Sequence, residues 1–149
     1  MVKERQNSMD EEIVRFLQQQ TCATICVVDE NGSPYCFNCM YAFTGEFGLL
    51  YFKSSADTHH AGLLKTSSLV AGTILPDKLN VILPKGVQFN GLVLQEHDPL
   101  TEKASLFYHK KFPIAIAVSG EVWTIRINRI KMTDSTKGFR KKITWASDG

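Results

Sequence analysis

Residues 49–64, LLYFKSSADTHHAGLL, constrain the fold of this chain more than any other segment. They begin with an apolar and aromatic run of the kind that fills a buried strand. The run ends at a lysine and two serines (53–55), and either Asp57 or Thr58 is placed to cap a new helix. The sequence therefore predicts a buried strand that leads directly into a short helix.

The junction between that strand and helix concentrates groups that bind anions. Lys53 and His60 can supply positive charge, Ser54 and Ser55 supply hydroxyl groups, and the helix start supplies free backbone N–H groups. The glycine fingerprints of dinucleotide and nucleoside triphosphate sites are both absent from the sequence. We therefore expect a ligand that carries a phosphate but binds in a different cradle.

Strand-like runs recur along most of the chain. The runs at 22–28 and 35–43 flank DENGSP, which is a strong hairpin signal. In the last strand, 121–133, alternation predicts one buried face, with Ile127 and Ile130 on opposite sides. Further strands are expected at 49–53, 68–75 and 86–95, and short helices at 9–20, 58–65 and 99–112. This pattern predicts a small, mainly β barrel with short α-helices.

Four cysteines, Cys22, Cys26, Cys36 and Cys39, raise the question of a metal site. Their spacing is loosely compatible with structural zinc, but they lie in β-branched and aromatic runs, not in tight knuckles. In an extended strand Cys36 and Cys39 would point to opposite faces. We expect no metal site and interpret the cysteines as small apolar core residues. A disulfide framework is not expected, because the chain begins without an export signal.

Length and charge bound the remaining possibilities. We expect the 149 residues to form one domain, with a flexible N-terminus at 1–9 and a basic tail at 134–149. No apolar run approaches the roughly 20 residues that span a membrane, so a cytoplasmic protein without a membrane partner is expected. Residues 1–100 carry 7 Lys and Arg against 11 Asp and Glu, whereas residues 101–149 carry 10 against 4. We expect the basic tail to contact a second subunit through Phe139 and Trp145, and not to fold back on its own barrel.

The order of these motifs resembles the pyridoxamine 5'-phosphate oxidase-like FMN-binding split barrels. The similarity covers roughly residues 10–145 and includes LYFKSS, THHAGLL, LVAGTI and GVQFNGLV. The ending IKMTDSTKGFRKKITW is similar to a bacterial subgroup whose reactions are largely unassigned. The resemblance implies a six-stranded antiparallel split barrel that forms a homodimer, with FMN in clefts between the subunits.

The resemblance also implies a set of cofactor-binding residues. The phosphate of FMN would lie at the end of the strand and the start of the helix, while the flavin ring would lie against the neighbouring strand. The implied residues are Phe52, Lys53, Ser54, Ser55, Thr58, His59 and His60 for the phosphate, Asn38, Cys39 and Met40 beside the ring, and Gln88 at the ring or ribityl chain. The simpler alternatives are that the serines only cap the helix, that the histidines are solvated, and that Trp123 is a core or interface residue.

The resemblance favours an FMN-dependent oxidoreductase that acts on an unknown small substrate. No nucleophile–base motif is present, so catalytic residues are not predicted. One alternative is a flavin or haem carrier or sensor without turnover, and a deazaflavin could occupy the same cleft. A less favoured alternative is a nucleic-acid-binding barrel that uses Arg126, Arg129, Lys131, Arg140, Lys141 and Lys142.

Overall fold

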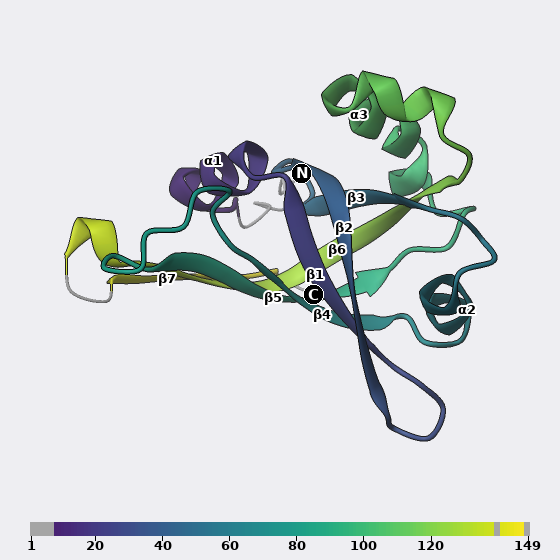
Figure 1. The fold of residues 1–149 in the computed structure, drawn as a ribbon, viewed down its shortest axis with the longest axis horizontal. Helices are drawn as coiled ribbons and strands as arrows, with labels where there is room; N and C mark the ends of the chain where they lie inside the picture. Colours follow the sequence, from purple (N-terminus) through teal and green to yellow (C-terminus); the bar gives the residue numbers. More distant parts are fainter. Residues whose placement is uncertain (1–7, 139–140, 148–149) are drawn as a thin grey trace, which may run out of the picture.

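The computed structural model describes residues 8–138 and 141–147 as a mainly β structure with short helices (Figure 1). The elements, in chain order, are α1 Glu11–Gln19, β1 Cys22–Val28, β2 Pro34–Thr44, β3 Leu49–Ser54, α2 His59–Thr66, β4 Leu69–Ile74, β5 Lys85–Val93, η1 Pro99–Thr101, α3 Ala104–Lys111, η2 Pro113–Ala117, β6 Glu121–Asp134, η3 Ser135–Lys137 and β7 Lys141–Ala146. Within the described ranges, no helix is long and apolar enough to cross a membrane.

Six antiparallel strands close into a barrel. The sheet order is β3-β2-β1-β4-β5-β6-β7, and a further pairing of β3 with β6 closes the ring. Closure depends on the length of β6, which has 14 residues. One half of β6 pairs with β3, from Glu121 to Arg126, and the other half pairs with β7, from Arg129 to Asp134. The predicted six-stranded antiparallel split barrel is confirmed, with β7 as an added strand.

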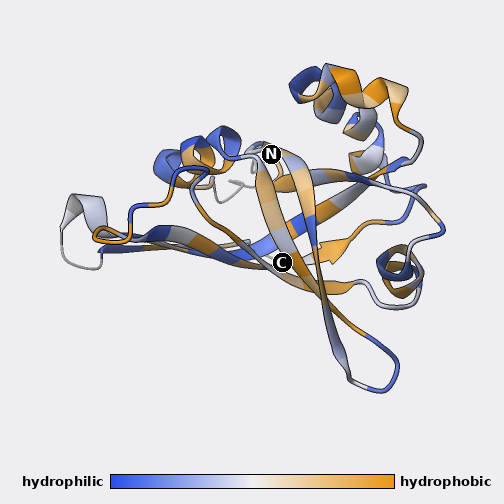
Figure 2. Ribbon diagram, in the orientation of Figure 1, coloured by the Kyte–Doolittle hydropathy of each residue, from blue (hydrophilic) through white to orange (hydrophobic). Residues whose placement is uncertain are grey.

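The main hydrophobic core fills the barrel and extends beneath α1. Ile13, Phe16 and Leu17 form the buried face of α1, while in its acidic first turn Glu11 is exposed and Glu12 is half-buried. Asp10 begins the helix by accepting a hydrogen bond from the Glu12 N–H at 2.8 Å. A smaller apolar cluster lies between α3 and the sheet, on the other side of β3. In Figure 2 the strands carry much of the hydrophobic colouring, whereas the tip of the β1–β2 hairpin is hydrophilic.

The helix predicted at 99–112 is interrupted. Asp98 accepts a hydrogen bond from the Leu100 N–H at 2.9 Å and caps the short η1 turn. The Thr101 hydroxyl donates back to the Asp98 carbonyl at 2.8 Å, which closes this turn on itself. Helix α3 therefore begins separately at Ala104.

A bulge changes which side chains of β6 are buried. The pairing of β5 with β6 skips Asn128 between Asn90 and Gly91. The extra residue shifts the alternation by one position, so Ile127 and Ile130 are both fully buried. The expectation that these two isoleucines lie on opposite sides of the strand is therefore wrong.

Three of the four cysteines are not core residues. Cys22 and Cys36 are exposed, and Cys26 is partly exposed, because alternate residues of β1 and β2 face outward. Cys39 faces inward and packs against the main core, where burial raises the pKa of its thiol to about 12. Cys36 and Cys39 thus point to opposite faces, as predicted. In the described part of the chain, no three His, Cys, Asp or Glu side chains are grouped to hold a metal ion.

Both ends of the described chain pack against the barrel. Strand β7 pairs with β6 of the same chain, and Trp145 packs against the main core. The expectation that the tail does not fold back on its own barrel is wrong, because the second half of β6 offers β7 an unpaired edge. Phe139 lies outside the described residues. Met9, at the end of the N-terminus predicted as flexible at 1–9, is buried; residues 1–7 lie outside the described part.

Candidate functional site

Two hydroxyl groups and an imidazole meet where β3 leads into α2. Thr58 caps α2, since its hydroxyl oxygen accepts a hydrogen bond from the Ala61 N–H at 3.3 Å. The Ser54 hydroxyl lies 3.3 Å from the Thr58 hydroxyl and 2.6 Å from His60 Nε2. We call Ser54, Thr58 and His60 the hydroxyl–histidine cluster. The Thr58 hydroxyl donates to the Ser55 carbonyl at 3.0 Å. The cluster lies at a helix N-terminus, a position that suits an anion.

Strand β2 positions both histidines. The Phe37 ring stacks on the His60 ring, with 3.9 Å between centroids and 10° between planes. The Tyr35 ring meets His59 edge-on, with 4.7 Å between centroids. Partial burial, and secondarily the neighbouring His59, lower the pKa of His60 below its ordinary value of 6.5. His60 is therefore mainly neutral at pH 7, and a nearby anion would favour its protonated form.

Lys53 does not join this cluster, contrary to expectation. Successive strand residues point to opposite faces, so Lys53 lies on the other side of β3 from Ser54. Its ammonium group donates to the Ala115 carbonyl at 2.7 Å and lies 3.0 Å from His109 Nε2. The cation predicted for the phosphate is thus used to hold η2 and α3 to the barrel.

Two other predicted phosphate residues are engaged differently. The Ser55 hydroxyl donates to the carboxylate of Asp57, so it is occupied and lies beside a negative charge. Phe52 is fully buried, and its ring packs between Phe37 and Trp123, at centroid distances of 5.6 and 6.3 Å. Phe52 therefore supports the cluster from the core side, and the packing makes Trp123 in part a core residue.

The predicted ring-binding residues lie on the outer face of the sheet. Asn38 and Met40 are exposed there, and Asn38 Oδ1 accepts a hydrogen bond from the Thr24 hydroxyl at 2.8 Å. The Cys39 side chain faces the core, so only its backbone can contact a ligand on the outer face. Asn38 and Met40 therefore face away from the hydroxyl–histidine cluster, because His60 of that cluster stacks on Phe37, which lies on the other face of β2.

Gln88 is also exposed on the outer face but lies farther away. Cross-strand pairs form a row from Asn38 through Thr24 and Thr73 to Gln88. Three strand spacings separate the ends of this row, which is about 14 Å. The backbones of β1 and β4 therefore separate Asn38 from Gln88 within one chain.

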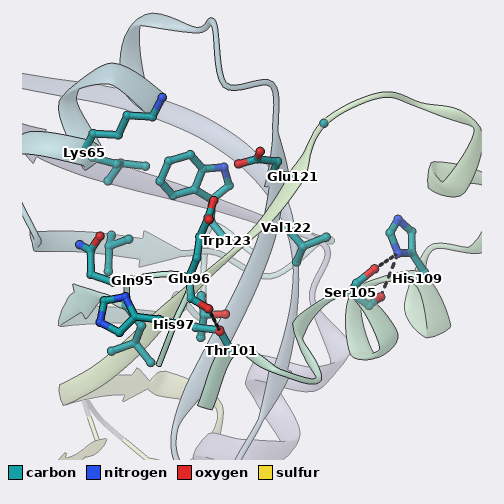
Figure 3. Close-up of a pocket in the computed structure, with 15 residues that line it drawn as sticks. Lys65, Gln95, Glu96, His97, Thr101, Ser105, His109, Glu121, Val122 and Trp123 are labelled. Carbon is teal, nitrogen blue, oxygen red and sulfur yellow. Dashed lines mark hydrogen bonds between the residues drawn. The ribbon is translucent and has the colours of Figure 1, made fainter. Parts of the chain in front are cut away.

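A separate pocket of about 640 Å³ lies where β5 leaves the barrel and β6 begins (Figure 3). Lys65, Glu121 and Trp123 line one part, and Ser105 and His109 of α3 line another. Its volume is in the range that holds a small molecule. In the described structure, Trp123 Nε1 is buried without a hydrogen-bond partner. Sequence reasoning missed this pocket, because its residues come from four separate segments.

His109 has a fixed orientation at the edge of that pocket. Because Lys53 can only donate, His109 Nε2 must accept its hydrogen bond. His109 then carries its proton on Nδ1, which donates to the Ser105 carbonyl at 2.9 Å. These two hydrogen bonds therefore fix both the tautomer and the orientation of the His109 ring.

The cations considered for nucleic-acid binding lie along β6 and β7. Arg126, Arg129, Lys131, Lys141 and Lys142 are exposed, and Arg140 lies outside the described residues. Among the residues described on these two strands, no aromatic side chain is fully exposed, since Trp123 and Trp145 are both half-buried. This face lacks the exposed stacking platform that single-strand binding uses.

Comparison with known proteins gives a family. No family model matches the chain. It is 35% identical over 133 residues to UPF0306 protein plu4501 of Photorhabdus laumondii subsp. laumondii, covering 89% of this chain and 92% of that protein. It is 37% identical over 133 residues to UPF0306 protein YhbP of Escherichia coli (strain SMS-3-5 / SECEC), covering 89% and 90%. The chain belongs to the UPF0306 family.

Solved structures show the same fold at low sequence identity. A haem-binding protein from Mycobacterium smegmatis matches with a TM-score of 0.73 and 14% identity, covering 89% of this chain but only 56% of that one. The haem storage protein HutZ of Vibrio cholerae matches with a TM-score of 0.61 and 13% identity, covering 94% and 95%. An F420 reductase matches with a TM-score of 0.61 and 17% identity, covering 82% and 98%. These three structural neighbours share the split-barrel fold, and their names mention haem or F420.

Proposed function

We propose that this UPF0306 chain binds FMN, with the phosphate at the hydroxyl–histidine cluster, and serves as a flavin-dependent oxidoreductase for a small substrate. The observation that carries the proposal is the convergence of Ser54, Thr58 and His60 at the N-terminus of α2. The fold it shares with proteins that handle haem and F420 supports a cofactor-binding role.

The residues of the cluster fit a phosphate. The Ser54 hydroxyl can donate to its oxygens, the Thr58 hydroxyl can do so in exchange for its bond to the Ser55 carbonyl, and His60 can add a charge-assisted hydrogen bond once protonated. Phe37 holds the imidazole plane, so little side-chain freedom is lost on binding. Charge near the phosphate would come from His60 and the helix N-terminus, because Lys53 is directed elsewhere. When bound, FMN supplies the redox chemistry, and the protein binds and orients it.

The outer face of the barrel supports a homodimer. Asn38 and Gln88 lie at opposite ends of a row about 14 Å long, yet both are expected at the flavin. A second copy would bring its own Gln88 toward the Asn38 of the first, and each FMN would then lie between subunits. The side chains between them, Thr24 and Thr73, are small and uncharged, which suits close approach of two sheet faces.

A haem carrier is the second candidate. His59 is exposed, and the edge-on contact with Tyr35 orients its ring. An exposed imidazole is a suitable axial ligand for haem iron. This reading needs His59, whereas the FMN reading needs His60 and Ser54.

Titration of the purified full-length protein with FMN and, separately, with haemin tests the two candidates. FMN binding that His60→Gln weakens, while His59→Gln does not, supports the proposal. A haem Soret band that His59→Gln abolishes, with no FMN binding, would replace it with the second candidate. Sedimentation equilibrium of the FMN-bound protein tests the dimer, and a monomer that retains FMN would contradict it.

A further inference from the structure

Two cysteines face each other across the first hairpin. The register of β1 and β2 places Cys26 directly opposite Cys36, on the outer face of the barrel. Cys36 is exposed and Cys26 is partly exposed, so small solutes reach the pair.

The hydrogen bonds on either side of the Cys26–Cys36 pair determine whether it is a hydrogen-bonded or a non-hydrogen-bonded pair. The Tyr41 N–H donates to the Thr21 carbonyl at 3.0 Å, and the Asp29 N–H donates to the Ser33 carbonyl at 2.9 Å. Both contacts belong to hydrogen-bonded pairs, and such pairs alternate with non-hydrogen-bonded ones. The Cys26–Cys36 pair is an odd number of steps from each, so it is a non-hydrogen-bonded pair.

That position brings the two thiols within bonding range. Directly opposite Cα atoms in a non-hydrogen-bonded pair are about 4.5 Å apart, and a disulfide needs about 4.4–6.8 Å. The two thiols already interact. Burial is the largest cause of the raised pKa of the Cys26 thiol, and a hydrogen bond with Cys36 is the second. Cys22 and Cys39 have other partners, Met40 and Ala23, and point to opposite faces. No other cysteine pair is placed so favourably.

We propose that Cys26 and Cys36 form a reversible dithiol–disulfide site. A small disulfide such as oxidised glutathione is the oxidant. The exposed Cys36 thiolate attacks one of its sulfurs and releases one thiol, giving a mixed disulfide on Cys36. The Cys26 thiolate then attacks Cys36 Sγ, forms the Cys26–Cys36 bond and releases the second thiol. Two protein thiols become one disulfide, and one oxidised glutathione becomes two reduced ones.

The bond would cross-link the part of the hairpin that reaches α2. Cys36 lies between Tyr35 and Phe37, whose rings contact His59 and His60. In a reducing compartment the pair remains a dithiol, and the disulfide forms only as oxidised glutathione accumulates.

The test uses the full chain equilibrated in mixtures of reduced and oxidised glutathione, then trapped in acid and alkylated after unfolding. The reduced protein has four alkylatable cysteines. In oxidised glutathione we expect the number of alkylatable cysteines to fall by two and the intact mass to fall by two hydrogens. Peptide mapping should find Cys26 joined to Cys36 in the same chain. Dithiothreitol should restore all four.

Matched variants make the test specific. The double variant Cys22→Ser/Cys39→Ser should still form the disulfide, whereas Cys26→Ser and Cys36→Ser should each fail to form an internal bond. Peptide mapping of the unmodified protein decides the question even if a variant folds poorly. Four free thiols after oxidation, a bond to Cys22 or Cys39, or a bond between two chains would overturn the proposal.

Discussion

Replacement of Ser54 by alanine should weaken FMN binding without disturbing the fold. Ser54 lies at the end of β3, and its hydroxyl is the group shared by Thr58 and His60 in the cluster. Alanine removes one donor to the phosphate and leaves His60 Nε2 to solvent. The His60 ring keeps its stacking contact with Phe37, so the local structure should persist.

The size of the effect follows from the kind of hydrogen bond that is lost. A hydrogen bond to a charged group contributes about 1.5–3 kcal/mol. Since about 1.4 kcal/mol corresponds to a tenfold change, the dissociation constant of FMN should rise roughly 10- to 150-fold. Quenching of flavin fluorescence on titration with protein measures it directly.

A matched control lies at the other end of the same helix. Thr66→Ala also removes a hydroxyl, one that donates to the Leu63 carbonyl at 3.1 Å, but far from the cluster. It should leave FMN affinity within about twofold of the parent value, since surface substitutions of this kind have small effects. If Ser54→Ala binds FMN as tightly as Thr66→Ala does, the phosphate is not at the cluster.

Three further predictions concern pH, the last strand and one glycine. FMN affinity should fall as pH rises, by at most tenfold per pH unit, because binding favours protonated His60. The fall should begin below pH 6.5, since the pKa of His60 in the free protein is lowered. The variant His60→Lys should flatten this pH dependence. An affinity that stays constant from pH 5 to 9 would refute this. Truncation after Ser135 removes β7 and the packing of Trp145, and should lower the free energy of unfolding by about 3 kcal/mol or more in urea; an unchanged urea midpoint would show that β7 adds nothing. Gly72→Ala should destabilise by about 1–3 kcal/mol, because a Cβ would lie 2.3 Å from the Phe89 ring and 2.8 Å from a backbone oxygen; an equal thermal midpoint would contradict that packing.

Local patterns predicted most of the elements. The first strand was predicted at 22–28 and lies there, because its β-branched run and the following turn residues are local signals. Thr58 was one of two predicted caps for α2, and its hydroxyl does cap the helix. Ser54 and His60, which were both expected at the junction of strand and helix, lie within hydrogen-bonding distance there.

Long-range pairing was not predictable from local patterns. The role of β7 depends on the edge that β3 leaves free along β6, and nothing near residue 141 indicates that edge. The bulge at Asn128 shifts the buried face of β6 and has no signal in the alternation itself. Lys53 could have been separated from Ser54 by strand alternation alone, which places neighbours on opposite faces.

Comparison of FMN with riboflavin tests the central claim most directly, because the two ligands differ only in the phosphate. If the cluster holds that phosphate, the parent protein should bind FMN at least tenfold more tightly than riboflavin. The double variant Ser54→Ala/His60→Gln should bind the two ligands with nearly equal affinity, while its affinity for riboflavin stays close to that of the parent. Equal affinity of the parent protein for FMN and riboflavin, or an FMN preference that survives in the double variant, would contradict the account.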